Sequence, residues 1–308
     1  MHAQDSIPIR LHPYNFLELP GLQPYITNTV VMAAEKEPIL SPVQGYPRSD
    51  ILNQIEARLS AAQTNCKMMG RPVVTLAYAQ SLDGSIASAE GKPLALSSTE
   101  ALTLTHALRA AHDAILVGIG CVLADNPRLT VRLIPGRSPQ PVIVDSRLRC
   151  PLSANLLSSN GTSPWIVTTD KANKKRQKLL ETAGARVIRV KSASGSRIDL
   201  FTLLATLASM GVTSVMVEGG AQIITSFLED HLVDQVVVTI APLLVGGLRG
   251  VRTAPAMPPG TRSTEFTRAG DAFTESHPKN PFPRLVNISY EIVGNDLVVR
   301  GDPDWAGP

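Results

Sequence analysis

Short apolar runs rich in valine and isoleucine alternate with longer helical patterns through the middle of the chain. This alternation limits the possible folds more than any other feature. Buried strands of this length that alternate with helices predict a mostly parallel central sheet with helices on both faces. The runs lie at Val73–Ala77, Ala114–Val117, Val142–Val144, Trp165–Val167, Val187–Val190, Val215–Val217 and Val236–Ile240.

Three helices between these runs have recognisable signals. Ser97-x-x-Glu100 reads as a capping box and predicts a helix that ends near His112. Lys171–Ala183 has the pattern of a basic amphipathic helix, and Asp199 is placed to cap an apolar helical face that continues to Met210.

The end of the chain has a different pattern. Leu285–Ile292 and Asp296–Val299 flank Gly294-Asn295, which is typical of a hairpin turn. We therefore expect an α/β fold whose parallel sheet gains an antiparallel C-terminal hairpin.

Proline marks the irregular segments. Residues 1–47 have turn-forming prolines and no sustained period, which predicts an irregular N-terminal arm. Residues 249–283 contain Pro258-Pro259-Gly260 and Pro281-Phe282-Pro283, which predicts a Pro/Gly-rich insert within one domain over 48–308.

Composition excludes several classes of protein. The 308 residues are 44% hydrophobic, and 29 basic against 26 acidic side chains leave a net charge of +3, which is too balanced to suggest a nucleic-acid partner. Three widely spaced cysteines form neither a disulfide framework nor a CxxC metal motif, so we expect no metal. The longest apolar stretch, Val236–Gly247, contains Pro242 and is too short for a bilayer. With prolines and Asp5 where a secretory signal would lie, we expect a cytoplasmic protein.

Glycine follows two of the predicted strands, and Asp145-Ser146 follows a third, at the sheet edge where parallel folds bind ligands. Gly118-x-Gly120 is an incomplete dinucleotide fingerprint and is weak evidence by itself. Gly219-Gly220 precedes a helical pattern, so it fits a phosphate-binding turn or a plain tight turn equally well.

Taken together and in order, these segments resemble the reductase family of riboflavin biosynthesis, which has a dihydrofolate-reductase-like fold. The resemblance covers roughly Arg71 to Gly247 and the final hairpin. The matching motifs are Gln80-Ser81-Leu82-Asp83-Gly84, Leu108-Arg109, Asp113–Gly118, Val122–Pro127 with Leu129-Thr130-x-Arg132, Val144–Ser146, Val217–Ala221, Val233-Asp234 and Ile240–Gly247.

The resemblance implies an NADPH-dependent oxidoreductase that reduces a ribosyl group to a ribityl group. The zinc deaminase that often accompanies this domain needs H-x-E and P-C-x-x-C, and neither occurs here, so we expect no deaminase. The implied substrate is 2,5-diamino-6-(ribosylamino)-4(3H)-pyrimidinone 5′-phosphate, and the implied assembly is a homodimer. The residues leave two alternatives open: a reductase of the same fold for another carbonyl or pterin-like substrate, and a non-catalytic nucleotide-binding relative.

The resemblance also implies site residues, each with a plainer structural alternative such as a turn residue, a packed apolar side chain or a solvated charge. Position 121 is commonly threonine in the family, and Cys121 keeps the size but donates hydrogen bonds poorly. Arg147 and Arg149 are candidates for the cofactor's 2′-phosphate, although exposed surface arginines are the commoner case. The implied NADPH contacts are Gln80, Cys121, Asp125, Ser146, Gly219, Gly220, Ala221, Gln222 and Ile223. The implied substrate contacts are Asp83, Arg109, Leu129, Arg132 and Glu218, with Asp125 and Glu218 as catalytic residues.

Overall fold

The structure is a computed structural model that describes residues 49–158, 162–192, 197–251 and 282–305. The predicted arm over 1–47 and most of the predicted insert over 249–283 lie outside these residues, so both remain predictions. None of the helices within the described ranges has the length and apolarity that crossing a membrane requires.

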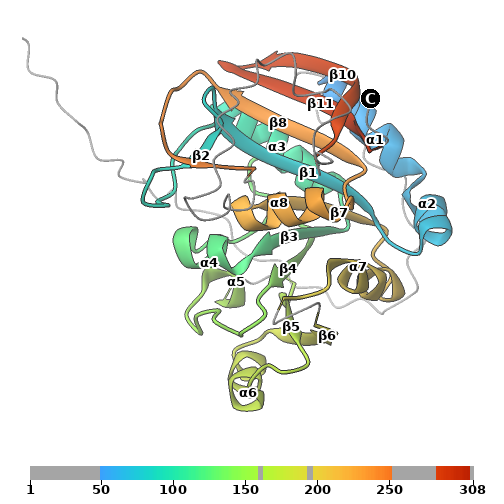
Figure 1. Cartoon of the computed structure of the whole chain (residues 1–308), viewed down its shortest axis with the longest axis vertical. Helices are drawn as coiled ribbons and strands as arrows, with labels where there is room; N and C mark the ends of the chain where they lie inside the picture. Colours follow the sequence, from blue (N-terminus) through green and yellow to red (C-terminus); the bar gives the residue numbers. More distant parts are fainter. Residues whose placement is uncertain (1–48, 159–161, 193–196, 252–281, 306–308) are drawn as a thin grey trace, which may run out of the picture. The chain divides into compact units, whose positions relative to one another are not determined.

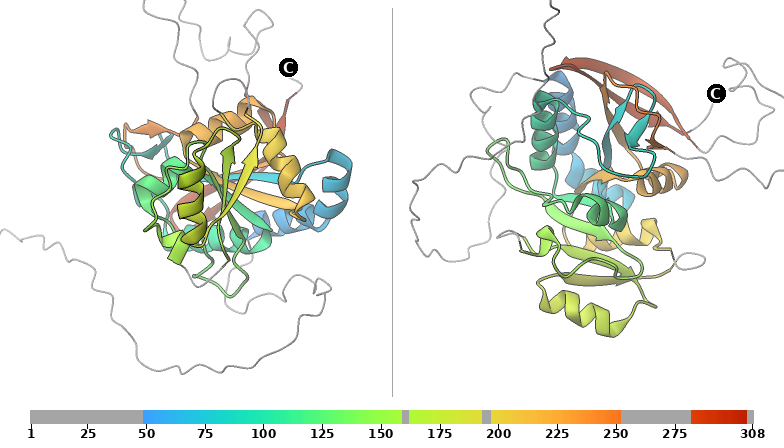
Figure 2. Two further views of the ribbon diagram at one scale, coloured as in Figure 1. Left: turned by 90° about the horizontal axis from the view of Figure 1, so that it is seen from below. Right: turned by 90° about the vertical axis from the view of Figure 1, so that its left-hand side faces the viewer.

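A nine-stranded sheet forms the centre of the described residues, and its helices cover both faces (Figure 1, Figure 2). The strands are β1 (Val73–Ser81), β3 (Ala114–Gly118), β4 (Gln140–Val144), β5 (Trp165–Thr169), β6 (Arg186–Val190), β7 (Ser214–Gly219), β8 (Gln235–Ala241), β10 (Arg284–Val293) and β11 (Asp296–Asp304). The helices are α1 (Asp50–Ser60), α2 (Ala62–Met69), α3 (Thr99–Ala111), α4 (Ile119–Asp125), α5 (Asn155–Ser158), α6 (Lys174–Thr182), α7 (Leu200–Ser209) and α8 (Ala221–Glu229). A small second sheet pairs β2 (Ser85–Ala87) with β9 (Leu248–Arg249).

The strand order is β10-β11-β8-β1-β7-β3-β4-β5-β6. All neighbours from β8 to β6 are parallel, whereas β11 pairs antiparallel with both β8 and β10. The hairpin therefore extends one edge of a parallel sheet, as Figure 1 shows, and the predicted fold class is confirmed.

Alternate residues of each central strand pack into different cores. On β7, Val215 and Val217 join the side chains of α7 and α8, whereas Met216 faces the other way, toward α1 and α3. A third cluster lies around α4, α5 and α6. A strand that is buried on both faces reads as a continuous apolar run, which is why these strands were visible in the sequence.

The predicted helix boundaries were right in one case and displaced in another. Asp199 caps α7 by accepting the backbone N–H of Thr202. The predicted cap at Ser97 is wrong by one residue, because Ser98 accepts the N–H of Ala101 instead. Helices α1 and α2 lie in a stretch for which no element was predicted.

Candidate active site

A cavity of about 1120 Å³ opens beside the C-terminal ends of β3 and β7. These two strands are neighbours in the sheet, and each is followed directly by a helix, α4 and α8. Helix α3 contributes Arg109 to the same cavity. The topology thus brings the predicted glycine segments together with a predicted substrate residue.

The turn between β7 and α8 is fixed by its backbone. Gly219 has φ 69° and Gly220 has φ 92°, both in the region that favours glycine. A Cβ on Gly220 would lie 2.9 Å from Cys121 Sγ, and one on Gly219 would collide with Ile224. This turn therefore requires glycine at both positions.

Helix α8 begins without a side-chain cap. Its N-cap is Gly220, whereas α1, α3, α6 and α7 are capped by Ser49, Ser98, Asn173 and Asp199. The first N–H groups of α8, which follow this turn, have no capping side chain, and the helix dipole makes this end positive. A turn and helix start of this kind suit a phosphate group, so the residues fit a phosphorylated cofactor.

Cys121 connects the two glycine turns. Its Sγ donates a hydrogen bond to the carbonyl oxygen of Gly219 at 2.8 Å. Burial, followed by the nearby carboxylates of Asp125 and Glu218, raises the pKa of this thiol to about 11. The thiol is therefore protonated near neutral pH and serves as a donor to the turn rather than as a nucleophile.

Arg109 and Glu218 form a two-point ion pair at the cavity wall. Arg109 Nε lies 2.6 Å from one carboxylate oxygen of Glu218, and Nη2 lies 2.7 Å from the other. Both side chains are about 15% exposed. Burial would lower the pKa of Arg109, but the carboxylate of Glu218 outweighs it and raises this pKa. The pair is nearly neutral as a unit, so it adds little net charge to the cavity.

Most of the remaining predicted cofactor residues line the cavity. Ser146 and Asp125 line the cavity, as do Ala221, Gln222 and Ile223 of α8. Burial raises the pKa of Asp125 above its usual value. Gln80 is not among the residues that line the cavity.

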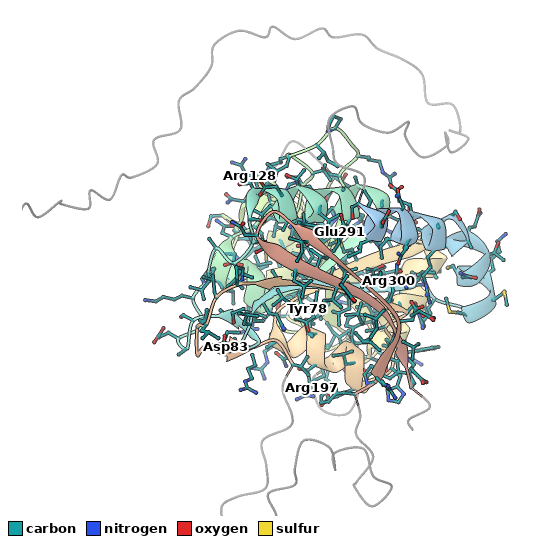
Figure 3. All side chains as sticks on the ribbon, turned by 90° about the horizontal axis from the view of Figure 1, so that it is seen from above. Tyr78, Asp83, Arg128, Arg197, Glu291 and Arg300 are labelled. Atoms are coloured by element: carbon teal, nitrogen blue, oxygen red, sulfur yellow. The ribbon has the colours of Figure 1, made fainter. Side chains whose placement is uncertain are left out.

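Asp83 lies at a turn, apart from the cavity lining. It accepts the N–H groups of Val245 and Gly246 at 3.1 and 2.6 Å, and the hydroxyl groups of Ser81 and Ser85. The Ser81 hydroxyl and then the two N–H groups hold the pKa of this carboxyl well below its usual range. In this structure Asp83 joins the end of β1 to the loop before β9, and Figure 3 shows it well apart from Arg128. Its predicted substrate contact remains a prediction.

Two further predicted substrate residues, Leu129 and Arg132, follow α4. Leu129 has φ 57° and is 3% exposed, and it packs into the cluster around α4 to α6. Arg132 is exposed, and its Nη1 donates to the hydroxyl of Thr130 at 2.9 Å. Burial and the like charges of Arg109 and Arg128 lower the pKa of Arg132, so three guanidinium groups lie near one another here.

Three cavity features were not predicted from the sequence. Arg109 and Glu218 were each expected to contact substrate, but not to pair with each other across 109 positions. Tyr78 of β1 lines the cavity, and burial raises the pKa of its phenol. Arg197, before α7, also lines it. No local pattern could have revealed any of them, because only the folded sheet brings these segments together.

The site has two ends: a glycine end, formed by the β3–α4 and β7–α8 turns, and a basic end, formed by Arg109 and Glu218. The segment with Arg132 adjoins the basic end through the bond from Arg109 to the Thr130 carbonyl oxygen, but Leu129 and Arg132 are not among the residues that line the cavity. This arrangement is suited to an α/β enzyme that holds a phosphorylated cofactor beside an anionic substrate.

Comparison with known proteins identifies the family. The family model of the RibD C-terminal domain matches residues 72–270. This range is more than half of the chain, so the chain belongs to that family, the reductases of riboflavin biosynthesis, and the resemblance seen in the motifs is confirmed.

The most similar relatives carry consistent names. The 2,5-diamino-6-ribosylamino-4(3H)-pyrimidinone 5′-phosphate reductase of Archaeoglobus fulgidus is 36% identical over 219 residues, which cover 66% of this chain and 96% of the relative. That of Methanothermobacter thermautotrophicus is 42% identical and covers 59% of this chain and 83% of its own. The riboflavin biosynthesis protein RibD of Aquifex aeolicus is 39% identical over 57% of this chain, and the chain spans about half (48%) of its length.

Solved structures agree on the fold. RibD of Acinetobacter baumannii matches with a TM-score of 0.61 at 24% identity, over 80% of this chain and 62% of its own. The riboflavin biosynthesis reductase Rib7 of Saccharomyces cerevisiae matches with a TM-score of 0.57 at 25% identity, over 82% of this chain and all of its own.

Proposed function

We propose that this chain reduces the ribosyl group of 2,5-diamino-6-(ribosylamino)-4(3H)-pyrimidinone 5′-phosphate to the ribityl product, with NADPH as cofactor. The observation that carries the proposal is one cavity that is lined both by the glycine turns and by the Arg109–Glu218 pair. Relatives named for this reaction support the substrate, and one of them is covered over 96% of its length.

The glycine end is our proposed NADPH site. Gly219, Gly220 and the first residues of α8 (Ala221, Gln222, Ile223) would hold phosphate through backbone N–H groups, with Cys121 fixing the turn behind them. When bound, the reduced nicotinamide supplies the hydride. Ser146 and Arg149 line the cavity as well, whereas Arg147 is not among the lining residues. We therefore assign Arg149 rather than Arg147 to the 2′-phosphate, which would favour NADPH over NADH.

The basic end is our proposed substrate site. The charge of Arg109 is offset by Glu218, and after the bonds to Glu218 and Thr130 its Nη1 also lies 3.5 Å from His106 Nε2, which leaves one N–H, on Nη2, for a further partner. Arg132 has no carboxylate within ion-pair distance in the described ranges. We assign the substrate phosphate mainly to Arg132, with Arg109 adding one directed hydrogen bond.

Two carboxylates are the proposed catalytic residues. The ribosylamine must open to an imine before C1′ accepts a hydride, and the imine nitrogen then needs a proton. Asp125 lines the cavity, and we assign the role of proton donor to it; burial raises the pKa of its carboxyl. Glu218 is held rigidly by Arg109 and would orient the substrate.

We also propose a homodimer that forms through β10. Every second side chain of this edge strand is apolar and exposed: Val286 (37%), Ile288 (54%), Tyr290 (75%) and Ile292 (69%). An apolar stripe on an edge strand favours pairing with a second copy. Sedimentation of the full chain tests this, and a monomer at micromolar concentration would contradict it.

A cytoplasmic location, where NADPH is available and the free thiols persist, remains part of the proposal.

The direct test is loss of NADPH absorbance with and without the pyrimidine ribosyl phosphate. Substrate-dependent oxidation is the expected result. If NADPH binds but only a pterin or another carbonyl is reduced, the substrate assignment is wrong. Binding without any turnover would instead indicate a non-catalytic relative.

A further inference from the structure

The segment that carries Arg132 has no regular secondary structure, and α3 holds it in place. The backbone N–H of Arg132 donates to His106 Nδ1 at 2.8 Å, and that of Leu133 approaches the same atom at 3.4 Å. One turn further along α3, Arg109 Nη1 donates to the carbonyl oxygen of Thr130 at 3.2 Å. Two side chains at i and i+3 of one helix thus fix the backbone on both sides of Arg132.

His106 can hold this position only as a neutral acceptor. The residue is 4% exposed, and since Nδ1 accepts the N–H of Arg132, the ring hydrogen is on Nε2. Nε2 lies 3.5 Å from Arg109 Nη1, so with this tautomer the two donors are in contact without a hydrogen bond between them. Burial, followed by the charges of Arg109 and Arg132, lowers the pKa of His106 to about 4. The imidazole is therefore uncharged at neutral pH.

A neutral acceptor has a specific advantage here. A carboxylate at position 106 could accept the same N–H groups, but it would also neutralise the guanidinium groups beside it. Glu218 already offsets Arg109, so the positive charge that remains for an anion is that of Arg132 with its neighbour Arg128. An imidazole fixes the backbone without reducing that charge.

We propose that His106 is a positioning residue for recognition of the substrate phosphate, acting through the backbone of Arg132. This inference rests on the proposed function, since it assumes that Arg132 binds the phosphate. His106 itself touches neither cofactor nor substrate in this assignment.

The test compares His106→Leu with His106→Asn. Leucine removes the acceptor, whereas the asparagine side-chain oxygen can take the place of Nδ1. We expect His106→Leu to raise the KM for the pyrimidine ribosyl phosphate about tenfold, because the backbone N–H of Arg132 loses its acceptor and Arg132 loses its position. The KM for NADPH should stay unchanged, and His106→Asn should restore most of the substrate KM. A purely structural role would not produce this split between the two KM values.

Arg132→Ala tests the proposed phosphate site separately from the positioning role of His106. If Arg132→Ala leaves the substrate KM unchanged, the proposed phosphate site is wrong, whatever His106 does. If Arg132→Ala raises that KM and folded His106→Leu does not, the positioning role is overturned. Should His106→Leu fail to fold, His106→Asn and His106→Gln decide, because the longer glutamine places its amide nearer Nε2. Equal substrate KM values for these two variants would overturn the proposal.

Discussion

The two ends of the candidate site are built in different ways. At the glycine end the shape comes from backbone conformation: Gly219 and Gly220 both have positive φ, and α8 starts without a side-chain cap. At the basic end it comes from side chains that support one another, with Arg109 paired to Glu218 and His106 holding the segment of Arg132. The first depends on a few local conformations, whereas the second depends on contacts between distant segments.

This contrast explains what each end tolerates. A backbone site is disturbed by any added side chain, but it contains few groups that titrate. In a site built from side chains, removing one partner leaves the other buried without its hydrogen bond or counter-charge, which lowers stability. Its titratable groups also make such a site respond to pH. Five predictions test the contrast, from the variant that should abolish turnover to the one that should change a KM least.

Glu218→Ala should have the largest effect. It leaves the guanidinium of Arg109 buried without its carboxylate, which costs about 3 kcal/mol of unfolding free energy, and turnover should be lost. The double variant Arg109→Met/Glu218→Leu should regain much of that stability without regaining activity. Urea unfolding and NADPH oxidation measure both. A Glu218→Ala protein as stable as the parent would show that the pair is not a supporting contact.

Gly220→Ala tests the glycine end. Alanine at φ 92° and ψ 142° is strained by about 2 kcal/mol, and its Cβ would press on Cys121, so both stability and NADPH affinity should fall. Gly120→Ala is the matched control for stability alone, because Gly120 lies in α4 with no protein atom within 4 Å of an added Cβ, but it lines the cavity. Thermal unfolding and the KM for NADPH report the result. Equal unfolding temperatures for the two variants would refute a conformational requirement at Gly220.

Acid should weaken the fold through the basic end and the helix that supports it. Burial lowers the pKa of both His106 and His112 to about 4, whereas an unfolded histidine titrates near 6.5. Between these pH values the unfolded chain therefore binds protons that the folded chain does not bind. The free energy of unfolding is at its full value above about pH 6.5 and falls as the pH drops toward 4. The slope is at most about 1.4 kcal/mol per pH unit for each histidine.

The measurement is urea unfolding between pH 7 and pH 4. His112, whose Nδ1 lies 2.6 Å from the Leu108 carbonyl, is the residue to replace. A His112→Gln protein should lose stability less steeply with acid. If its pH profile runs parallel to that of the parent, His112 contributes nothing to the acid sensitivity.

Arg149→Ala should shift cofactor preference. We expect the ratio of kcat/KM for NADPH over NADH to fall about fivefold, since an exposed charge contact contributes about 1 kcal/mol. Arg147→Ala should leave the ratio unchanged, because Arg147 is not among the residues that line the cavity. The same fall in both variants would point to general charge rather than to a specific contact.

Cys121→Ser should have the smallest effect. Serine keeps a donor to the carbonyl of Gly219, so the KM for NADPH should change by less than about threefold. Cys121→Val, which keeps the volume but lacks a donor, should raise it more. If serine and valine behave alike, the hydrogen bond from Cys121 does not support the turn.

Much of the fold could be predicted from the sequence, because its signals are local. Strands buried on both faces read as valine-rich runs, Asp199 marks the start of α7, and Gly294-Asn295 marks the hairpin. The start of α3 was misplaced by one residue because Ser97 and Ser98 are both good caps, and only the observed bond to Ala101 selects Ser98. Helix α1 could have been found from Ser49 and the spacing of Ile51, Ile55 and Leu59.

The site was predictable at one end and not at the other. Gly219-Gly220 before a helical pattern is a short signal with a conformational meaning, and the structure gives both residues positive φ. The pairing of Arg109 with Glu218 and the support of Arg132 by His106 join segments that are far apart in sequence. No spacing rule specifies such contacts, because they depend on the order of strands in the sheet.

The bare start of α8 also affects how the ligand-free protein should behave. A glycine N-cap costs a helix only about a few tenths of a kcal/mol relative to serine or aspartate, but it leaves the first N–H groups of α8 without a side-chain acceptor. A ligand that supplies the missing acceptor binds only the folded chain, and at a hundred times its dissociation constant it adds about 2.7 kcal/mol. Ligand binding at the start of α8 should therefore raise the melting temperature of the protein. Candidate nucleotides could be screened by measuring that rise.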